Sequence, residues 1–207
     1  HLPAFAAAGL SVSALLAAVF FLRESLAPAA RIGASTHVIR RYWASIGEVV
    51  RDRSLNVPVL LTFLATFVFA GMEATFAMWS ERQLGWGPQQ NGYLFAFIGV
   101  LSAIVQGTLI GPLARRFGEG PMIAHGAAAL ALGSLAVPLC TSLFPLLAAM
   151  AVLAYGFSVI TPSLNSLISL RTAQGSQGAV LGATRSASTF ARVVGPAWAG
   201  FLFAGLG

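Results

Sequence analysis

The sequence predicts an all-α polytopic membrane protein, and three observations carry that prediction. The composition is 57% hydrophobic and only 9% charged, with a mean hydropathy of +0.81, whereas soluble domains carry roughly 25% charged residues. Six apolar stretches are each near the ~20 residues that a helix needs to cross a bilayer. The arginines gather in alternate connections between these stretches. Because the apolar runs are continuous rather than alternating, we expect helices and not barrel strands.

The six predicted spans follow one another along the whole chain. The first is an unbroken apolar run, the second and sixth each hold a charged residue well inside them, the third and fifth carry polar side chains, and the fourth is rich in alanine and glycine. Their expected ranges are 4–22, 58–80, 92–114, 121–140, 145–170 and 179–206.

The connections predict the orientation of the chain. Nine arginines lie in the first, third and fifth connections, whereas the second and fourth together hold one, Arg82. Cytoplasmic loops carry an excess of basic residues. Residues 23–57 are therefore expected to be cytoplasmic, with His1 and Gly207 outside. The net charge of +6 does not indicate a nucleic-acid partner, because the arginines lie in loops and not on one basic face.

The long connection contains an amphipathic pattern. Ile39, Tyr42, Trp43, Ile46 and Val49 recur at helical spacing, with basic and polar residues opposite them. This pattern is typical of a helix that lies on the inner membrane surface. Such a helix serves as a docked linker or as a regulatory element, and the sequence leaves both readings open.

Glu73 and Arg192 are the charged side chains within the predicted second and sixth spans. A charge in the hydrocarbon costs roughly 2.5–3.5 kcal/mol on insertion scales and commonly faces a cavity. Each lies at a similar depth from the inner end, so an ion pair or a shared cavity fits the geometry. We expect Glu73 to bind a proton or a cationic substrate, with a structural hydrogen bond or a gate as the alternative. Arg185 is expected to reach the headgroups.

Polar residues also interrupt the third and fifth spans. They are Gln106 in the third and Tyr155, Ser158, Thr161, Asn165 and Ser166 in the fifth, and the strongest candidates among them are Gln106, Tyr155 and Asn165. Either they line a wet pathway with the second and sixth spans, or they form contacts between helices. In the fourth span, Gly126 and Gly133 suit close packing, and His125 is expected to contact solvent.

No catalytic or metal-binding pattern is present, so we expect neither an enzyme nor a cofactor. The only aspartate is Asp52, in the long connection, and no HExxH, CxxC or Walker loop occurs. The single cysteine, Cys140, excludes an intrachain disulfide and has no ligand cluster beside it.

Several motifs resemble the major facilitator superfamily, in particular the C-terminal half of its tetracycline-efflux-like drug:proton antiporters. Gly111-Pro-Leu-Ala-Arg-Arg-Phe-Gly118 resembles the family's G-x-L-A-D-R-x-G loop, and Gly195-Pro-Ala-Trp-Ala-Gly200 resembles its GP-x-x-x-G motif. Phe69-Ala-Gly-Met-Glu73 and Gly175-Ser-Gln-Gly178 add to the likeness. Arg115 stands where the loop usually has an aspartate, and Glu119 stands where a basic residue is common.

The resemblance implies a domain order and a set of motif residues. It implies that residues 1–22 are the last helix of an N-terminal half, 23–57 the loop between halves, and 58–207 a C-terminal bundle. The six spans would be helices six to eleven of a truncated fold without helix twelve. Since the chain begins at His1 without a methionine, we expect it to come from a longer protein. The motif residues expected to govern conformational change are Gly111, Arg115, Arg116, Gly118, Gly195, Pro196 and Gly200.

The leading hypothesis is a proton-coupled secondary transporter that exports a small drug-like molecule or metabolite by alternating access. Its expected partners are the lipid bilayer, a small-molecule substrate, protons and an N-terminal six-helix half, and its expected location is a bacterial inner membrane. Uptake by a symporter or uniporter is a second hypothesis. A membrane scaffold or receptor that does not transport is a third.

Overall fold

A computed structural model describes residues 2–21, 46–47, 49, 51–173 and 176–206. The chain divides into two units, His1–Ile39 and Arg40–Gly207. The described part of the first unit is helix α1, Leu2–Phe21. Within it, Ser11 and Ser13 donate hydrogen bonds to the carbonyls of Ala7 and Gly9, so these hydroxyls are satisfied by their own helix.

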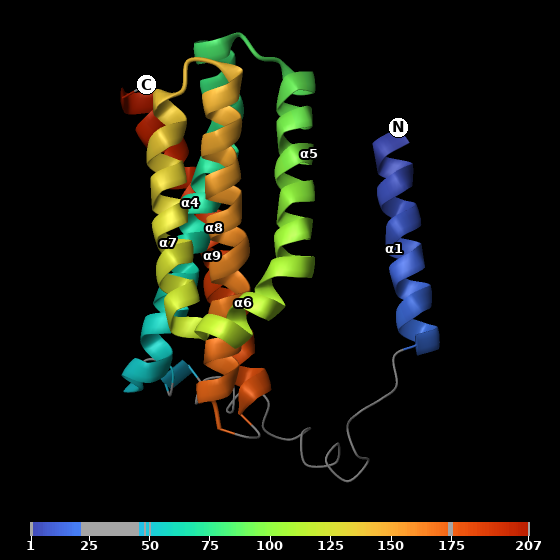
Figure 1. Ribbon diagram of the computed structural model, residues 1–207, viewed down its shortest axis with the longest axis vertical. Coiled ribbons are helices and arrows are strands. Elements are labelled where there is room, and N and C mark those ends of the chain that lie inside the picture. Colours follow the sequence, from blue (N-terminus) through green and yellow to red (C-terminus); the bar gives the residue numbers. More distant parts are fainter. Residues whose placement is uncertain (1, 22–45, 48, 50, 174–175, 207) are drawn as a thin grey trace. The chain divides into compact units, whose positions relative to one another are not determined.

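The described part of the second unit is a helical bundle without strands (Figure 1). Helix α4 is followed by α5, a five-residue π-helical turn (η1) and α6, and then by α7 with a short 3₁₀ turn (η2), α8 and α9. Their bounds are Arg53–Leu84 for α4, Pro88–Ile104 for α5, Val105–Leu109 for η1, Ile110–Phe117 for α6, Glu119–Ala136 for α7, Val137–Leu139 for η2, Leu143–Arg171 for α8 and Gln177–Leu206 for α9.

Every predicted span coincides with a helical segment. Four continuous helical stretches are long and apolar enough to cross a membrane, and they run over 53–84, 88–117, 119–139 and 143–171. The other two are α1, whose described apolar part is the shorter Ala7–Phe21, and α9, which carries Arg185 and Arg192. Most of the predicted amphipathic helix lies outside the described residues. Val49, on its predicted apolar face, is buried with Leu55, Ile168 and Val180.

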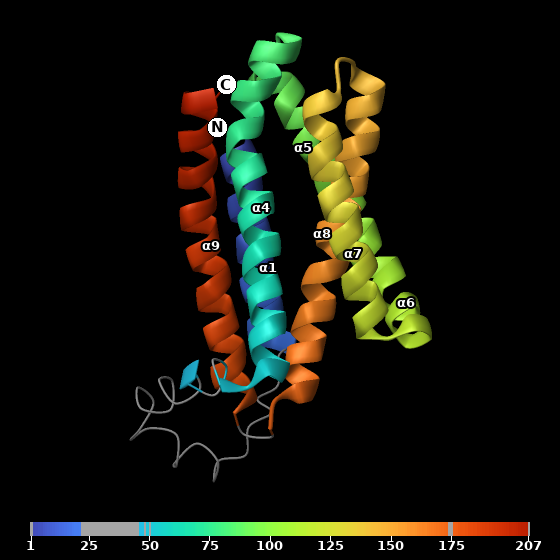
Figure 2. The same cartoon turned by 90° about the vertical axis from the view of Figure 1, so that its left-hand side faces the viewer.

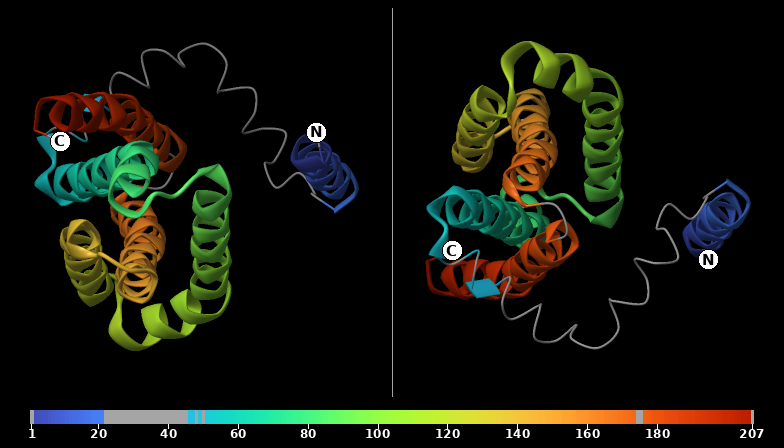
Figure 3. Two further views of the ribbon diagram at one scale, coloured as in Figure 1. Left: turned by 90° about the horizontal axis from the view of Figure 1, so that it is seen from above. Right: turned by 90° about the horizontal axis from the view of Figure 1, so that it is seen from below.

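Two pairs of helices make the most extensive contacts in the bundle, α7 with α8 and α4 with α9. Figure 3 shows both pairs side by side when the bundle is seen from its ends. The predicted role of the glycines in the fourth span fits the first pair. A Cβ atom on Gly133 would lie 2.6 Å from the Cβ of Leu153, and one on Gly126 would lie 3.2 Å from the Gly156 carbonyl oxygen. Helices α7 and α8 therefore approach closely where one or both of the facing residues are glycines.

Helix α4 begins at Arg53, before the apolar run that starts at Pro58. Asp52 caps the helix, because its Oδ1 accepts the Ser54 N–H at 2.8 Å. Hydrogen bonds from Ser54, first from its side chain and then from its backbone, hold the pKa of the Asp52 carboxyl below its ordinary value. The hydropathy pattern marks only the apolar part of α4, so the first turn was not predicted.

Pro58 lies inside α4 and has no N–H to donate to the Ser54 carbonyl four residues earlier. Arg171, in the last turn of α8, supplies the missing donor, since its Nη1 lies 2.9 Å from that carbonyl oxygen. A basic side chain that the sequence indicated only as an orientation signal thus joins the end of α8 to the start of α4.

We expect Gly133→Ala to lower the free energy of unfolding by about 1–3 kcal/mol, because the new methyl overlaps Leu153. The matched control is Gly92→Ala in α5, where nothing lies within 4 Å of an added Cβ. There the gain in helix propensity should leave stability unchanged or raise it. Thermal unfolding of the intact protein in detergent measures both, and equal shifts would contradict the close α7–α8 contact.

We expect Arg171→Met to destabilise the protein by about 1 kcal/mol through loss of its hydrogen bond to the Ser54 carbonyl. Pro58→Ala restores an N–H for that carbonyl, so the same Arg171 substitution should cost less in the Pro58→Ala background. A double-mutant cycle of unfolding free energies tests this. A cost that is the same in both backgrounds would show that Arg171 does not replace the proline's missing donor.

Candidate functional site

Glu73 stands out among the described acidic residues, because it alone lies away from a helix end. It is two positions beyond Gly71, which faces α9. At about 100° per residue, Glu73 points about 200° around the helix from Gly71 and so away from α9. Its side chain is exposed, and it forms no ion pair or hydrogen bond with a described residue.

The face of α4 that carries Glu73 is a polar stripe, formed by Thr62, Thr66, Glu73 and Ser80 at spacings of one or two helical turns. The members of this stripe other than Glu73 are buried. Ser80 donates a 2.9 Å hydrogen bond to Asn91 of α5. Beside the stripe, Phe69 stacks on Phe157 of α8 at 4.1 Å between ring centroids. Glu73 therefore lies on the side of α4 that is turned to α5 and α8.

Gly195 of the predicted motif packs directly on α4. A Cβ atom there would lie 2.7 Å from the Phe67 carbonyl oxygen, and a Cβ on Gly71 would lie 3.2 Å from the Ala199 Cβ. Figure 2 shows α4 and α9 side by side and running in the same direction. By contrast, nothing lies within 4 Å of a Cβ added to Gly200. Of the motif's two glycines, only Gly195 is required by helix packing in this bundle.

The α4–α9 contact also sets the relative depth of Glu73 and Arg192. With Gly71 opposite Gly195, Glu73 lies two residues further along α4 and Arg192 three residues back along α9. At 1.5 Å per residue, the two are offset by about 7–8 Å along the helices. Arg192 is exposed. The two helices pack together close to these residues, but Glu73 points away from α9, and no ion pair joins the two side chains.

Tyr155 is held by α7. Its hydroxyl lies 2.8 Å from Nε2 of His125, and Nδ1 of the same ring lies 3.1 Å from the Pro121 carbonyl oxygen. Because a carbonyl only accepts, Nδ1 is the donor, and in a neutral ring Nε2 accepts the Tyr155 O–H. The expectation of solvent contact for His125 is therefore incomplete, because the half-buried ring also joins two helices.

Asn165 and Ser158 lie seven residues apart on one face of α8. Asn165 is half-buried, and its side chain has no hydrogen bond to a described residue. Ser158 is 1% exposed, and its Oγ has no partner among the described residues. In contrast, each of four other buried hydroxyls donates to the carbonyl four residues earlier in the chain; these are the hydroxyls of Thr62, Ser163, Thr172 and Thr184.

In a regular helix, the Ser158 carbonyl would accept the N–H of the residue four positions later. That residue is Pro162, which has no N–H. An unpaired hydroxyl and a carbonyl without its helical donor thus occur at one point in the middle of α8. The sequence signal was present, a serine four residues before a proline, but its burial was not predictable from the pattern. Ser158 was among the polar residues expected in the fifth span, but not among its strongest candidates for the site.

Gln106 lies in the π-helical turn η1, with its side chain exposed. The predicted third span is therefore not a regular helix throughout. In this turn Thr108 Oγ1 donates to the Ile104 carbonyl at 2.7 Å, and Figure 1 shows α6 leaving the direction of α5 beyond it. Single π-helical turns are frequent at functional sites. The polar and small residues Gln106-Gly107-Thr108 were the available signal.

The predicted motif loop forms α6 and the turn into α7. Gly118 ends α6 with φ +75°, a conformation that favours glycine. Glu119 accepts a 2.9 Å hydrogen bond from Ser166 of α8. Arg115 and Arg116 form no ion pair with a described residue, and the guanidinium of Arg116 lies over the Phe117 ring. A Cβ atom added to Gly111 would meet only the Arg115 side chain, at 3.9 Å.

A sequence profile described as "Major Facilitator Superfamily" matches residues 1–196. The chain is 25% identical to "Multidrug resistance protein 2" of Bacillus subtilis (strain 168), in an alignment that covers 98% of this chain and 50% of that protein. It is 28% identical to "Tetracycline resistance protein, class C" of Escherichia coli, over 95% of this chain and 49% of that protein.

A mammalian relative shows a similar level of identity. "Major facilitator superfamily domain-containing protein 10" of Mus musculus is 30% identical over 70% of this chain and 32% of its own length. The chain thus spans between about a third and a half of the length of these relatives. A search of solved structures found no match.

We expect Gly195→Ala to lower the thermal stability of the intact protein, because its methyl meets the backbone oxygen of Phe67. An overpacked contact of this kind costs about 1–3 kcal/mol. Gly200→Ala is the matched control within the same motif and should have little effect. Thermal unfolding in detergent measures the difference. If Gly200→Ala were the more damaging change, the assignment of the helix contact to Gly195 would be wrong.

Proposed function

The chain belongs to the Major Facilitator Superfamily, and we propose that it is part of a proton-coupled transporter that exports a small drug-like molecule or metabolite by alternating access. Membership supports an integral membrane transporter rather than an enzyme. We propose the coupling ion, the direction of transport and the substrate class in addition. The names of the multidrug and tetracycline resistance relatives support export of a drug-like compound.

The observation that carries the proposal is the position of Glu73. It is a carboxylate in the interior of an apolar helix, without a countercharge among the described residues, two positions from Gly71, which packs on α9. A carboxylate in hydrocarbon is costly, so it is retained where it binds something. In the proposed cycle, Glu73 binds a proton from one side of the membrane and releases it to the other.

Helix irregularities support the movement that alternating access requires. Pro162 interrupts α8, Pro196 interrupts α9 beside Gly195, and η1 widens the helix that carries Gln106. Glycine contacts let helices rock against each other, and broken helices near the centre of the membrane are common in secondary transporters. We propose that Arg192, Asn165 and Gln106 face the pathway, whereas Tyr155 acts mainly as a contact between α7 and α8.

We propose the following organisation for the chain. Residues 1–22 are the last helix of an N-terminal half, residues 23–57 are a cytoplasmic linker, and the remainder is a C-terminal bundle with helices seven to eleven of the fold. The substrate cavity then lies between this bundle and the N-terminal half. A bacterial inner membrane is the proposed location.

The test is proton-driven transport by the intact protein in inverted membrane vesicles, with tetracycline as the probe. Glu73→Gln keeps the size and hydrogen-bonding capacity of the side chain but cannot ionise. We expect it to abolish proton-driven accumulation while substrate exchange without a proton gradient persists. The matched control is Glu81→Gln, near the C-terminal end of α4. This variant should transport as the wild type does.

Normal proton-driven transport by Glu73→Gln would contradict the coupling role. Loss of both proton-driven transport and exchange, with the protein still folded, would assign Glu73 to substrate binding instead. Accumulation in right-side-out vesicles rather than inverted ones would favour the uptake hypothesis over export.

A further inference from the structure

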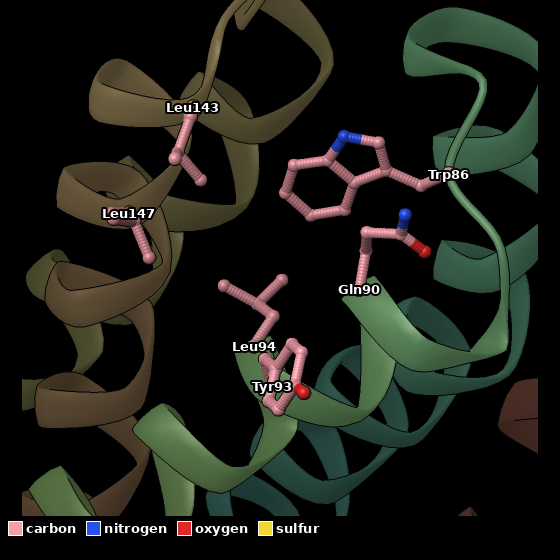
Figure 4. Close-up of a pocket in the computed structure, with 6 residues that line it drawn as sticks. All are labelled: Trp86, Gln90, Tyr93, Leu94, Leu143 and Leu147. Atoms are coloured by element: carbon pink, nitrogen blue, oxygen red, sulfur yellow. The ribbon is translucent and has the colours of Figure 1, made fainter.

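A cavity of about 420 Å³ lies between α5 and α8, at the end of the bundle that carries Trp86 (Figure 4). Its size falls in the range of ~300–1,000 Å³ found for small-molecule sites. None of the residues proposed for the proton and substrate pathway lines it. The lining residues are Trp86, Gln90, Tyr93, Leu94, Leu143 and Leu147.

The α4–α5 side of the cavity is held in place by buried contacts. Ser80 and Asn91 share a hydrogen bond, and Phe76 meets Phe95 edge to face at 5.8 Å between centroids. Trp86 lies in the short loop between Gly85, which has φ +66°, and Gly87. These contacts fix the distance between α4 and α5, so Trp86 and the start of α5 form a preorganised wall of the cavity.

The polar groups of the cavity include hydrogen-bond donors. Gln90 Oε1 accepts the Gly87 N–H at 3.1 Å, which leaves the amide nitrogen free to donate. Figure 4 shows that nitrogen on the side of the Trp86 ring. The Tyr93 hydroxyl accepts from Gln89 Nε2 at 3.1 Å and so keeps its own O–H for a further partner. The remaining lining is apolar, since Leu94, Leu143 and Leu147 form the other walls.

We propose that this cavity binds an uncharged aromatic compound that carries a hydrogen-bond acceptor, such as a ketone. The rings of Trp86 and Tyr93 provide apolar surface for an aromatic ligand, and the Gln90 amide donates to its acceptor. No charged residue is among the described residues that line the cavity, so neither an anion nor a phospholipid headgroup finds a countercharge there. A cation likewise finds no carboxylate in the lining, and a lipid tail would leave the donors of Gln90 and Tyr93 unused.

The test uses 6-propionyl-2-dimethylaminonaphthalene, a neutral naphthyl ketone whose emission moves to longer wavelength when its carbonyl accepts a hydrogen bond. The probe is titrated into the intact protein in phosphatidylcholine nanodiscs, and the signal of empty nanodiscs is subtracted. We expect Trp86→Ala and Tyr93→Ala each to weaken binding by about tenfold, because each removes an aromatic ring that lines the cavity. Trp198→Ala removes an exposed tryptophan of α9 that does not line the cavity, and it should leave binding unchanged.

Two further variants keep the test decisive if an alanine variant fails to fold. Leu143→Trp fills the cavity without removing a wall and should abolish binding. Gln90→Glu keeps the oxygen that accepts the Gly87 N–H but removes the amide donor, so the bound probe should emit at shorter wavelength. Acetophenone should compete better than benzoate or phenyltrimethylammonium, which carry the same ring with a negative or a positive charge.

Equal binding by the wild type, Leu143→Trp and Trp86→Ala would show that the probe reports lipid, and it would overturn the site. Stronger competition by either charged compound would overturn the proposed ligand class. Because binding is measured without a proton gradient, its failure is independent of the coupling role of Glu73.

Discussion

Direct contact between helix backbones is the constraint on which the rest of this bundle depends. Lipid tails are as apolar as the side chains that face them, so burial alone gives little drive for helices to associate in a membrane. The two most extensive contacts, α4 with α9 and α7 with α8, instead each place glycines of one helix directly against the neighbouring helix. Gly195 lies against the Phe67 carbonyl, and Gly133 lies against Leu153. These contacts set the depth of Glu73 relative to α9 and hold α8, with Ser158, beside α7.

Backbone hydrogen bonds are the second constraint, because a buried polar group without a partner is costly in lipid. Prolines inside α4 and α8 each remove a donor from their helix, and the two sites differ in what replaces it. The carbonyl that Pro58 leaves unpaired is bound by Arg171 of another helix. Pro162 removes the helical donor for the Ser158 carbonyl, and the hydroxyl of Ser158 is itself buried without a partner among the described residues. The first arrangement stabilises one end of the bundle, and the second leaves a polar point in the middle of α8.

Much of the fold was predictable from local sequence. Continuous apolar runs indicated the helices that the described parts of the chain form, because hydropathy over a span depends on neighbouring residues alone. The candidate site was less predictable. Glu73 was identified as a charge within a span, and Gly195 as part of a motif. The π-helical turn at Gln106, the His125–Tyr155 hydrogen bond and the unpaired Ser158 were not predicted, since each depends on residues that are distant in the chain or on a local change of helix type.

The sequence by itself determined that lipid surrounds most of the protein and that its fold is helical. It also determined the order of the spans and the residues whose charge is unusual in lipid. These follow from composition and spacing, which need no knowledge of neighbours in space. Only the tertiary structure decided which side each polar residue faces and what it contacts. It separated Glu73 from Arg192, assigned Tyr155 to a helix contact and formed the cavity at Trp86, because rotation and depth are set where helices pack and not by any one helix.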